Sequence, residues 1–310
     1  MPKLCPWPRV YISFHTTRLT KFITILDQTM GLTIVGCGYL GEVVARQLQP
    51  RRPTLPLTLT TTVTERHAEL TELADQLLLC EATDPAQLLA ALQQTHTALF
   101  CFAPRGNRQV NADGYRQTFV DSFRCLRSLL TELPHLRQII YTGSCSVYGD
   151  ADGDWVDEST APAAGTGHRE VLLESERLLT DMGNSKRRIC ILRLAALHGP
   201  GRELDDRLKG LAGRERTGDG RSFSNWVHVH DAAGALIAAM DGAWSGVVNV
   251  VNDEPIRIRD LVDLSLKRQQ LEPVHWSGGP APASGNGRRI RNDRLKALGY
   301  RLQHPMMNTG

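Results

Sequence analysis

The sequence lacks the features that mark several specialised protein classes. It contains no apolar run of the roughly 18 residues that a membrane span needs, so it predicts no contact with a membrane. Its seven cysteines include no Cys-x-x-Cys pair, which argues against a disulfide scaffold and favours buried structural thiols in a reducing compartment. With 41% hydrophobic and 22% charged residues, the chain is neither disordered nor collagen-like. We therefore expect a globular cytoplasmic protein.

A strong excess of one charge is also absent. The 310 residues include 36 Lys and Arg against 33 Asp and Glu, a net charge of +3. Residues 1–30 hold four basic side chains against Asp27 alone, which leaves 32 residues of each sign in the rest of the chain. A neutral body has no basic stripe of the kind that binds nucleic acid. The expected partner is therefore a small-molecule substrate.

Residues 1–30 do not resemble part of a fold. They contain prolines near the start, show no hydrophobic period, and have an apolar piece at 22–26 that is too short for a secretory signal. A basic, Thr-rich segment is also typical of a transit peptide, which is the less favoured alternative. We interpret residues 1–30 as a non-conforming extension ahead of a start at Met30, and expect a chain without residues 1–29 to fold.

From residue 31 to 194, apolar runs alternate with helical patterns. Strands are expected at 32–35, 57–62, 77–80, 98–102, 138–142 and 189–194, and helices at 39–49, 65–74, 85–94, 115–133 and 168–182. Strands that are apolar on both faces and separated by helices predict an α/β fold with a doubly wound parallel sheet of Rossmann type. This pattern assigns residues 31–195 to a dinucleotide-binding domain.

After residue 195 the pattern is less regular. Loops rich in Gly and Arg precede expected helices at 231–240 and 258–269 and an expected strand at 247–251. A stretch rich in Gly, Pro, Ala and Ser at 277–287 predicts a flexible loop. We therefore assign residues 196–310 to a smaller substrate-binding lobe.

The first expected strand leads directly into a G-x-G-x-x-G pattern. Its residues are Gly36, Cys37, Gly38, Tyr39, Leu40 and Gly41. The first glycine permits a tight turn, the second lets a pyrophosphate approach the backbone, and the third lets helix and strand pack closely. The N-terminus of the following helix supplies free N–H groups and partial positive charge. The pattern predicts dinucleotide binding, with a glycine-rich packing turn as the structural alternative.

The end of the second expected strand indicates which dinucleotide. An NAD site usually has an acidic residue there to bind the ribose 2′-OH, whereas residues 58–66 read TLTTTVTER. The hydroxyl of Thr61 and the guanidinium of Arg66 suit a 2′-phosphate, so we prefer NADP over NAD. Threonines are also common strand formers and Arg66 is also typical of a solvated helix start, so NAD stays open.

Several later motifs occur together. Residues 142–149 read TGSCSVYG, 192–194 read LRL, 199–202 read GPGR, 227–231 read VHVHD and 248–255 read VNVVNDEP. In this combination, over about residues 31–303, the sequence resembles the extended short-chain dehydrogenase/reductase superfamily, the NAD-dependent epimerase/dehydratase-like proteins. Those proteins usually have G-x-x-G-x-x-G, whose first Gly would fall at Val35, so the sequence looks more like the atypical members. The resemblance implies an oxidoreductase or epimerase acting on a nucleotide-sugar or small carbonyl substrate, and leaves a homodimer open.

The resemblance also implies catalytic residues, of which the sequence keeps only part. The family's catalytic Ser/Thr corresponds to Ser144. The family's Tyr-x-x-x-Lys pair is absent, with His168 at the Tyr position and Leu172 at the Lys position, and an Asn usual on the preceding helix is Phe119. His168 is a candidate acid–base group because its ordinary pKa lies near neutrality. The alternatives are a noncatalytic NADP-binding regulatory or sensing protein, or a His168 that is only a helix-start residue.

Further positions complete the predicted site. The resemblance places Glu81 near the adenine and Phe102, Ala103 and Pro104 along the central ribose and phosphates. Arg202 and Arg289 are candidates to bind a substrate phosphate or carboxylate, and solvated loop arginines are the alternative. His228 and His230 share one strand face, but no third ligand has a recognisable spacing, so we predict no metal site.

Overall fold

The structure is a computed structural model that describes residues 31–104, 111–165, 167–278 and 287–307. The interpretation of residues 1–30 lies outside the described residues, as does most of the loop expected at 277–287. The six cysteines of the described ranges are buried and free, as the sequence predicts. Within those ranges, no helix has the length and apolar character needed to cross a membrane.

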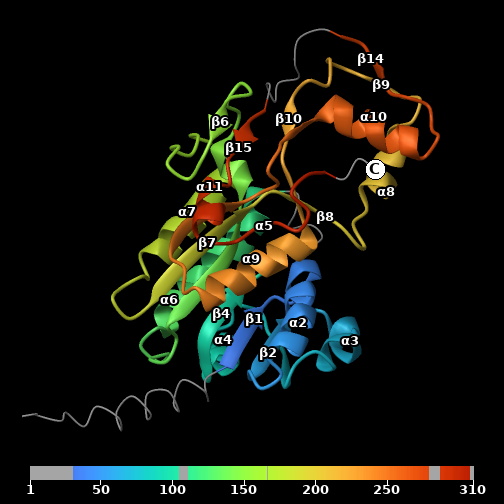
Figure 1. The fold of residues 1–310 in the computed structure, drawn as a ribbon. Helices are drawn as coiled ribbons and strands as arrows, with labels where there is room; N and C mark the ends of the chain where they lie inside the picture. The colour runs from blue at the N-terminus through green and yellow to red at the C-terminus, as the bar shows by residue number, and fades with distance from the viewer. Residues whose placement is uncertain (1–30, 105–110, 166, 279–286, 308–310) are drawn as a thin grey trace, which may run out of the picture.

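A parallel sheet forms the centre of the described part (Figure 1). Its order is β12-β7-β5-β4-β1-β2-β3, and every neighbouring pair is parallel. The strands are β1 (Gly31–Val35), β2 (Leu57–Thr61), β3 (Gln76–Leu79), β4 (Thr95–Phe100), β5 (Gln138–Ser144), β7 (Arg188–Leu194) and β12 (Gly246–Val250). The predicted Rossmann-type α/β fold is confirmed.

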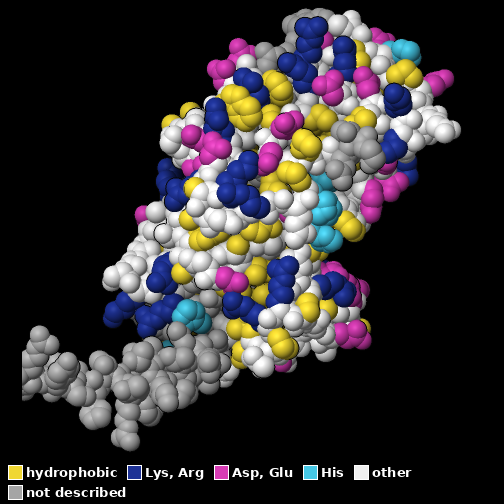
Figure 2. All heavy atoms as spheres, in the orientation of Figure 1, with side chains coloured by type: hydrophobic (Ala, Val, Ile, Leu, Met, Phe, Trp, Pro, Cys, Tyr) yellow, Lys and Arg dark blue, Asp and Glu magenta, His cyan; other side chains and the backbone are white. Residues whose placement is uncertain are grey.

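Helices cover both faces of this sheet. On one face lie α2 (Tyr39–Arg51), α3 (His67–Thr71) and α9 (Val229–Asp241), and on the other lie α4 (Pro85–Leu92), α5 (Ala112–Tyr115), α6 (Ser122–Leu129) and α7 (His168–Thr180). Because helices shield the central strands on both faces, all five residues of β1 are buried, whereas the edge strand β3 is partly exposed. On the molecular face shown in Figure 2, basic and acidic side chains are interspersed over most of the surface.

Two predicted helices differ from the observed ones. The helix expected at 65–74 is a short 3-10 turn, η1 (Thr64–Arg66), followed by α3. The helix expected at 115–133 begins earlier, in α5, and changes to a π-helical segment, η3 (Arg116–Asp121), before α6. A π-helical segment inside an α-helix changes which residues face the sheet, which a period of 3.6 residues does not anticipate.

The division at residue 195 differs from the observed sheet. Both α9 and β12, which the sequence assigned to the smaller lobe, belong to the central α/β unit: β12 pairs with β7, and α9 packs beside α2. The reason is burial, since Val248 and Val250 are fully buried and continue the hydrophobic core.

Most of the remaining elements lie over the carboxyl ends of the strands (Figure 1), whereas α11 (Asp293–Ala297) packs beside β12. The others are η4 (Cys145–Tyr148), β6 (Trp155–Val156), β8 (Ala196–His198), α8 (Leu204–Leu208), η5 (Lys209–Leu211), β9 (Glu215–Arg216), β10 (Phe223–Ser224), β11 (Trp226–His228), β13 (Ile256–Arg257), α10 (Ile258–Arg268), β14 (His275–Trp276) and β15 (Arg289–Ile290). A small core of Val262, Leu266 and Val274 holds α8 and α10 together. We call residues 196–228 and 253–278 the second lobe.

Candidate active site

A cavity of about 900 Å³ lies where the carboxyl ends of β1, β4 and β5 meet the second lobe. Because β1 is flanked by β2 on one side and β4 on the other, the cavity lies where strand order reverses, which is the usual ligand site of open α/β sheets. The predicted site residues that line it are Gly36, Gly38, Tyr39, Leu40, Thr61, Arg66, Glu81, Phe102, Ala103, Pro104, Ser144, His168 and Arg202. The fold thus brings most of the predicted site together.

The loop between β1 and α2 has the backbone of a phosphate-binding turn. Gly36 has a φ of +79°, and a Cβ there would lie 2.5 Å from the Cβ of Phe102. A Cβ on Gly41 would lie 3.1 Å from Cγ2 of Ile34, so the helix packs closely on the strand. A Cβ on Gly38 would meet no atom within 4 Å, so the space beside this residue is open. The loop therefore offers room for a ligand at its second glycine.

Cys37 lies beneath this loop and does not line the cavity. Its side chain is fully buried, and its N–H donates to the carbonyl of Thr60 over 2.7 Å. Burial raises the pKa of the Cys37 thiol to about 12, so the thiol stays protonated at neutral pH and is a poor nucleophile. Its contribution is the backbone conformation of the loop.

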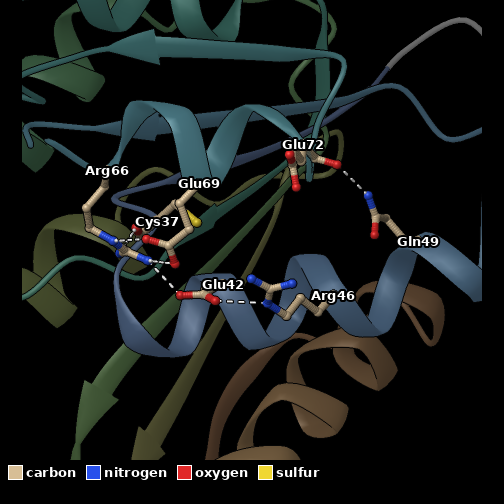
Figure 3. Close-up of polar contacts among 7 residues, drawn as sticks. All are labelled: Cys37, Glu42, Arg46, Gln49, Arg66, Glu69 and Glu72. Carbon is tan, nitrogen blue, oxygen red and sulfur yellow. Dashed lines mark hydrogen bonds and ion pairs between the residues drawn. The ribbon is translucent and has the colours of Figure 1, made fainter. Parts of the chain in front are cut away.

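Arg66 sits at the end of the cavity next to β2, held by three acceptors (Figure 3). It donates to the carbonyl of Cys37 over 2.9 Å, to Glu42 over 2.6 Å and to Glu69 over 3.1 Å. The guanidinium therefore bridges the phosphate loop, α2 and α3. Its hydrogen bond with Glu69 lowers the pKa of that carboxyl. Two carboxylates thus share the charge of Arg66, although no acidic residue of β2 itself lines the cavity.

Ser144 ends β5 and faces the cavity. Its hydroxyl donates to the Ser146 hydroxyl over 2.9 Å and accepts the Ser146 N–H over 3.2 Å. This serine turn caps η4 and fixes the Ser144 side chain at the strand end. The described contacts leave its second acceptor lone pair available for a ligand hydroxyl.

His168 is the first residue of α7 and lies on the cavity wall. Its imidazole packs against the ring of Tyr115, with ring centroids 4.2 Å apart. Leu172, one turn further along α7, also lines the cavity and is 6% exposed. The position at which the resemblance implies a lysine is therefore apolar, and Leu172 supplies no cation to the imidazole.

Aromatic rings that the sequence analysis did not assign to the site form much of the inner wall. Tyr115, Phe119 and Tyr141 line the cavity beside Phe102. Their centroids lie 5.6 Å apart for Tyr115–Phe119, 5.7 Å for Phe102–Phe119 and 5.9 Å for Phe119–Tyr141. The available signal was the i, i+4 spacing of Tyr115 and Phe119, which places both rings on one helix face.

A buried ion pair supports this wall from behind. Arg193 of β7 donates to both carboxylate oxygens of Glu176 on α7, over 3.0 and 2.7 Å. The Arg193 guanidinium also lies 4.9 Å from the ring centroid of Tyr148, whose hydroxyl donates to Asn249 over 2.8 Å. Burial raises the pKa of Tyr148 to about 12, so this phenol remains a neutral donor. The network fixes α7 to β7 and to the residues that follow Ser144.

Arg289 does not join the cavity. It lines a separate hollow of about 450 Å³ together with Asp152, Asp154, Asp219, Gly153, Arg221, Phe223 and Arg257. Its guanidinium lies 5.0 Å from the Trp155 ring centroid and 5.2 Å from that of Phe223, and donates to the carbonyl of Gly153. This arginine is therefore engaged with its own neighbours, away from Ser144.

The histidines near α9 also lie apart from the cavity lining. The rings of His228 and His230 have centroids 4.9 Å apart. Across the residues that the structure describes, no three His, Cys, Asp or Glu side chains are grouped so that they would hold a metal ion.

Comparison with known proteins agrees with this geometry. A model of the NAD-dependent epimerase/dehydratase family matches residues 32–251. The protein YeeZ of Escherichia coli K12 is 29% identical over 285 residues, which cover 88% of this chain and 96% of that protein.

Solved structures share the fold at low identity. A functionally unknown conserved protein from Silicibacter pomeroyi has a TM-score of 0.69 at 24% identity, over 90% of this chain and 95% of that one. A UDP-glucose-4-epimerase from Stenotrophomonas maltophila, with bound NAD and formylated UDP-arabinopyranose, has a TM-score of 0.74 at 17% identity, over 89% and 94%.

Proposed function

The chain belongs to the NAD-dependent epimerase/dehydratase family, and on that premise we propose that it is a dinucleotide-dependent oxidoreductase or epimerase. The main support is that one cavity is lined both by the glycine loop after β1 and by Ser144 at the end of β5. The proposed substrate is a nucleotide-sugar or a small carbonyl compound. The structurally similar epimerase with a bound UDP-sugar supports the first class.

The glycine loop fits a dinucleotide. The open space at Gly38 and the N-terminus of α2, whose N-cap makes no side-chain hydrogen bond, suit a pyrophosphate. Thr61 and Arg66 line the cavity where a ribose 2′-phosphate would lie, so we propose NADP as the preferred cofactor. Because Glu42 and Glu69 share the charge of Arg66, we expect a modest preference over NAD.

The proposed chemistry uses two side chains of this protein. Ser144 hydrogen-bonds the reacting oxygen of the substrate, and the His168 imidazole accepts the proton of a carbinol or returns it to a carbonyl oxygen. When bound, the nicotinamide supplies the hydride acceptor or donor. The aromatic wall of Tyr115 and Phe119 excludes water from the reacting atoms.

A second candidate function is a noncatalytic dinucleotide sensor. Leu172 and Phe119 favour it, because they put apolar groups where the family has a lysine and an asparagine. A sensor would retain the glycine loop and Arg66 and would not need His168.

The test combines binding with turnover. NADPH and NADH are titrated by ligand fluorescence, followed by a panel of nucleotide-sugars and small aldehydes monitored through the nicotinamide absorbance. We expect His168→Asn and Ser144→Ala to lower turnover at least about tenfold without changing the Kd for NADPH. Glu174→Gln is the matched control, because Glu174 is also on α7 but does not line the cavity. Unchanged turnover in both site variants contradicts the catalytic assignment, and binding without turnover of any substrate supports the sensor.

A further inference from the structure

We propose that Arg202 of the second lobe binds the diphosphate of the dinucleotide, with the ring of Tyr39 as its platform. The sequence suggests the substrate as the ligand of Arg202, and the structure places its guanidinium over the Tyr39 ring, beside the phosphate loop. This inference rests on the proposed dinucleotide-binding function and adds the residue through which the second lobe contacts the cofactor.

The contact joins two elements that are far apart in the sequence. The Arg202 guanidinium carbon lies 4.3 Å from the ring centroid of Tyr39, which is cation–π distance. Tyr39 is the first residue of α2 and follows Gly38 directly. Both Tyr39 and Arg202 line the cavity. The arginine therefore stands beside the loop whose N–H groups would receive a pyrophosphate.

The loop that carries Arg202 makes a turn at Gly201 next to Tyr39. Gly201 has a φ of +79°, and a Cβ there would lie 3.9 Å from the Tyr39 ring. The carboxylate of Glu203 accepts the Gly201 N–H over 2.8 Å. That bond fixes the turn and leaves the Glu203 carboxylate hydrogen-bonded to the backbone. In the described hydrogen bonds and ion pairs, Glu203 makes no contact with the Arg202 guanidinium.

The surroundings favour an anion at this place. The N-cap of α2 is Gly38, which has no side chain to occupy the helix N-terminus, and the space beside it is open. The hydroxyl of Tyr39 is buried without a hydrogen-bond partner among the described residues. Burial raises the pKa of this phenol, against an opposing effect of Arg202, so it stays a neutral O–H donor. The helix N–H groups beside Gly38 and the Arg202 guanidinium thus line one cavity, with the Tyr39 ring between them.

The test compares probes with and without a diphosphate. Arg202→Met keeps apolar contact with the Tyr39 ring and removes the charge. We expect the Kd of ADP-ribose to rise roughly tenfold, while the Kd of adenosine 2′-monophosphate, which lacks the diphosphate, stays unchanged. The matched control is Arg207→Met, because Arg207 is in the same lobe but stacks on Trp226 at 5.3 Å and does not line the cavity. Thermal unfolding checks that each variant is folded.

The outcomes separate this inference from the proposed function. If the wild type binds ADP-ribose and Arg202→Met binds it equally well, the inference is overturned and the dinucleotide site stands. If the variant only raises the KM of a turned-over substrate, Arg202 serves the substrate and the inference is again overturned. If the wild type binds neither probe nor NADPH, the proposed function fails together with the inference.

Discussion

At the scale of the residue, two glycines of the phosphate loop have different roles, one in the stability of the fold and the other in ligand binding. Gly36 has a positive φ and lies against Phe102, so the Cβ of Gly36→Ala would collide with Phe102. Gly38 has a φ of −94°, which any residue adopts, and open space beside it. An added methyl group should therefore lower the stability of the protein at Gly36, whereas at Gly38 it should weaken only the binding of the ligand.

We predict that Gly36→Ala lowers the free energy of unfolding by about 2 kcal/mol or more, whereas Gly38→Ala changes it by less than about 0.5 kcal/mol. In Gly38→Ala the Kd for NADPH should still rise at least about tenfold, because the new Cβ occupies the space that a pyrophosphate needs. Denaturant unfolding and fluorescence titration measure the two quantities. If Gly38→Ala binds NADPH with an unchanged Kd, the cofactor does not bind at this loop.

The buried pair Glu176–Arg193 offers a second residue-scale comparison, because Glu174 of α7 makes ion pairs that are more exposed. Glu176 and Arg193 side chains are 8% and 5% exposed, whereas Glu174, paired with Arg116 and Arg124, is 23% exposed against 37% and 50% for its partners. Removing one partner of a buried pair leaves an uncompensated charge. Exposed pairs contribute little because solvent screens them.

Glu176→Gln should therefore lower the free energy of unfolding by about 3 kcal/mol, and Glu174→Gln by less than about 1 kcal/mol. Urea unfolding of both variants at one pH makes the comparison. Equal, small losses in both variants would show that Arg193 finds other partners, such as the Tyr148 ring.

At the scale of the element, the sequence predicts well wherever a signal is local. The seven sheet strands have apolar runs, and the glycine loop and Ser144 belong to contiguous motifs, so the residues alone are enough to locate them. The short strands such as β8 and β11 have two or three residues and show no period. The partnership of Tyr115 with His168 joins α5 to α7, and only tertiary packing creates it. The placement of α9 and β12 likewise depends on long-range burial.

One helix start shows such a local signal in full. Asp84 precedes Pro85 and caps α4, accepting the N–H groups of Ala86 and Gln87 over 2.9 and 3.1 Å. Asp84→Ala should lower the free energy of unfolding by about 1 kcal/mol, because two helix N–H groups lose their acceptor. Asp84→Asn retains a side-chain oxygen and should lower it by less. Chemical denaturation compares them, and identical losses would assign the effect to charge at the helix N-terminus.

At the scale of the whole molecule, the C-terminal segment is tied to the start of α9. Asp231 is fully buried and accepts the N–H groups of Gln303 and His304 over 2.6 and 2.8 Å. Its carboxylate also lies 3.1 Å from Nδ1 of His304. The His304 ring stacks on His228 at 3.8 Å. Figure 2 shows histidine side chains gathered at the surface in this region, near β8.

This arrangement predicts a specific loss of stability in acid. Burial, followed by the charges of His304, His198 and His230, lowers the pKa of His228 from 6.5 to about 4, although Asp231 opposes the shift. Between these values the unfolded chain binds more protons at this residue than the folded one, so the free energy of unfolding falls as the pH is lowered from about 6.5 to about 4.

The variant His228→Asn tests this dependence. It removes the titrating group and keeps an acceptor for the His230 N–H, which Nδ1 of His228 accepts over 3.2 Å in the wild type. Urea unfolding across this range should therefore give a shallower pH dependence for the variant, since the carboxylates that titrate there are common to both proteins. Parallel curves for the two proteins would show that His228 does not contribute to the pH dependence.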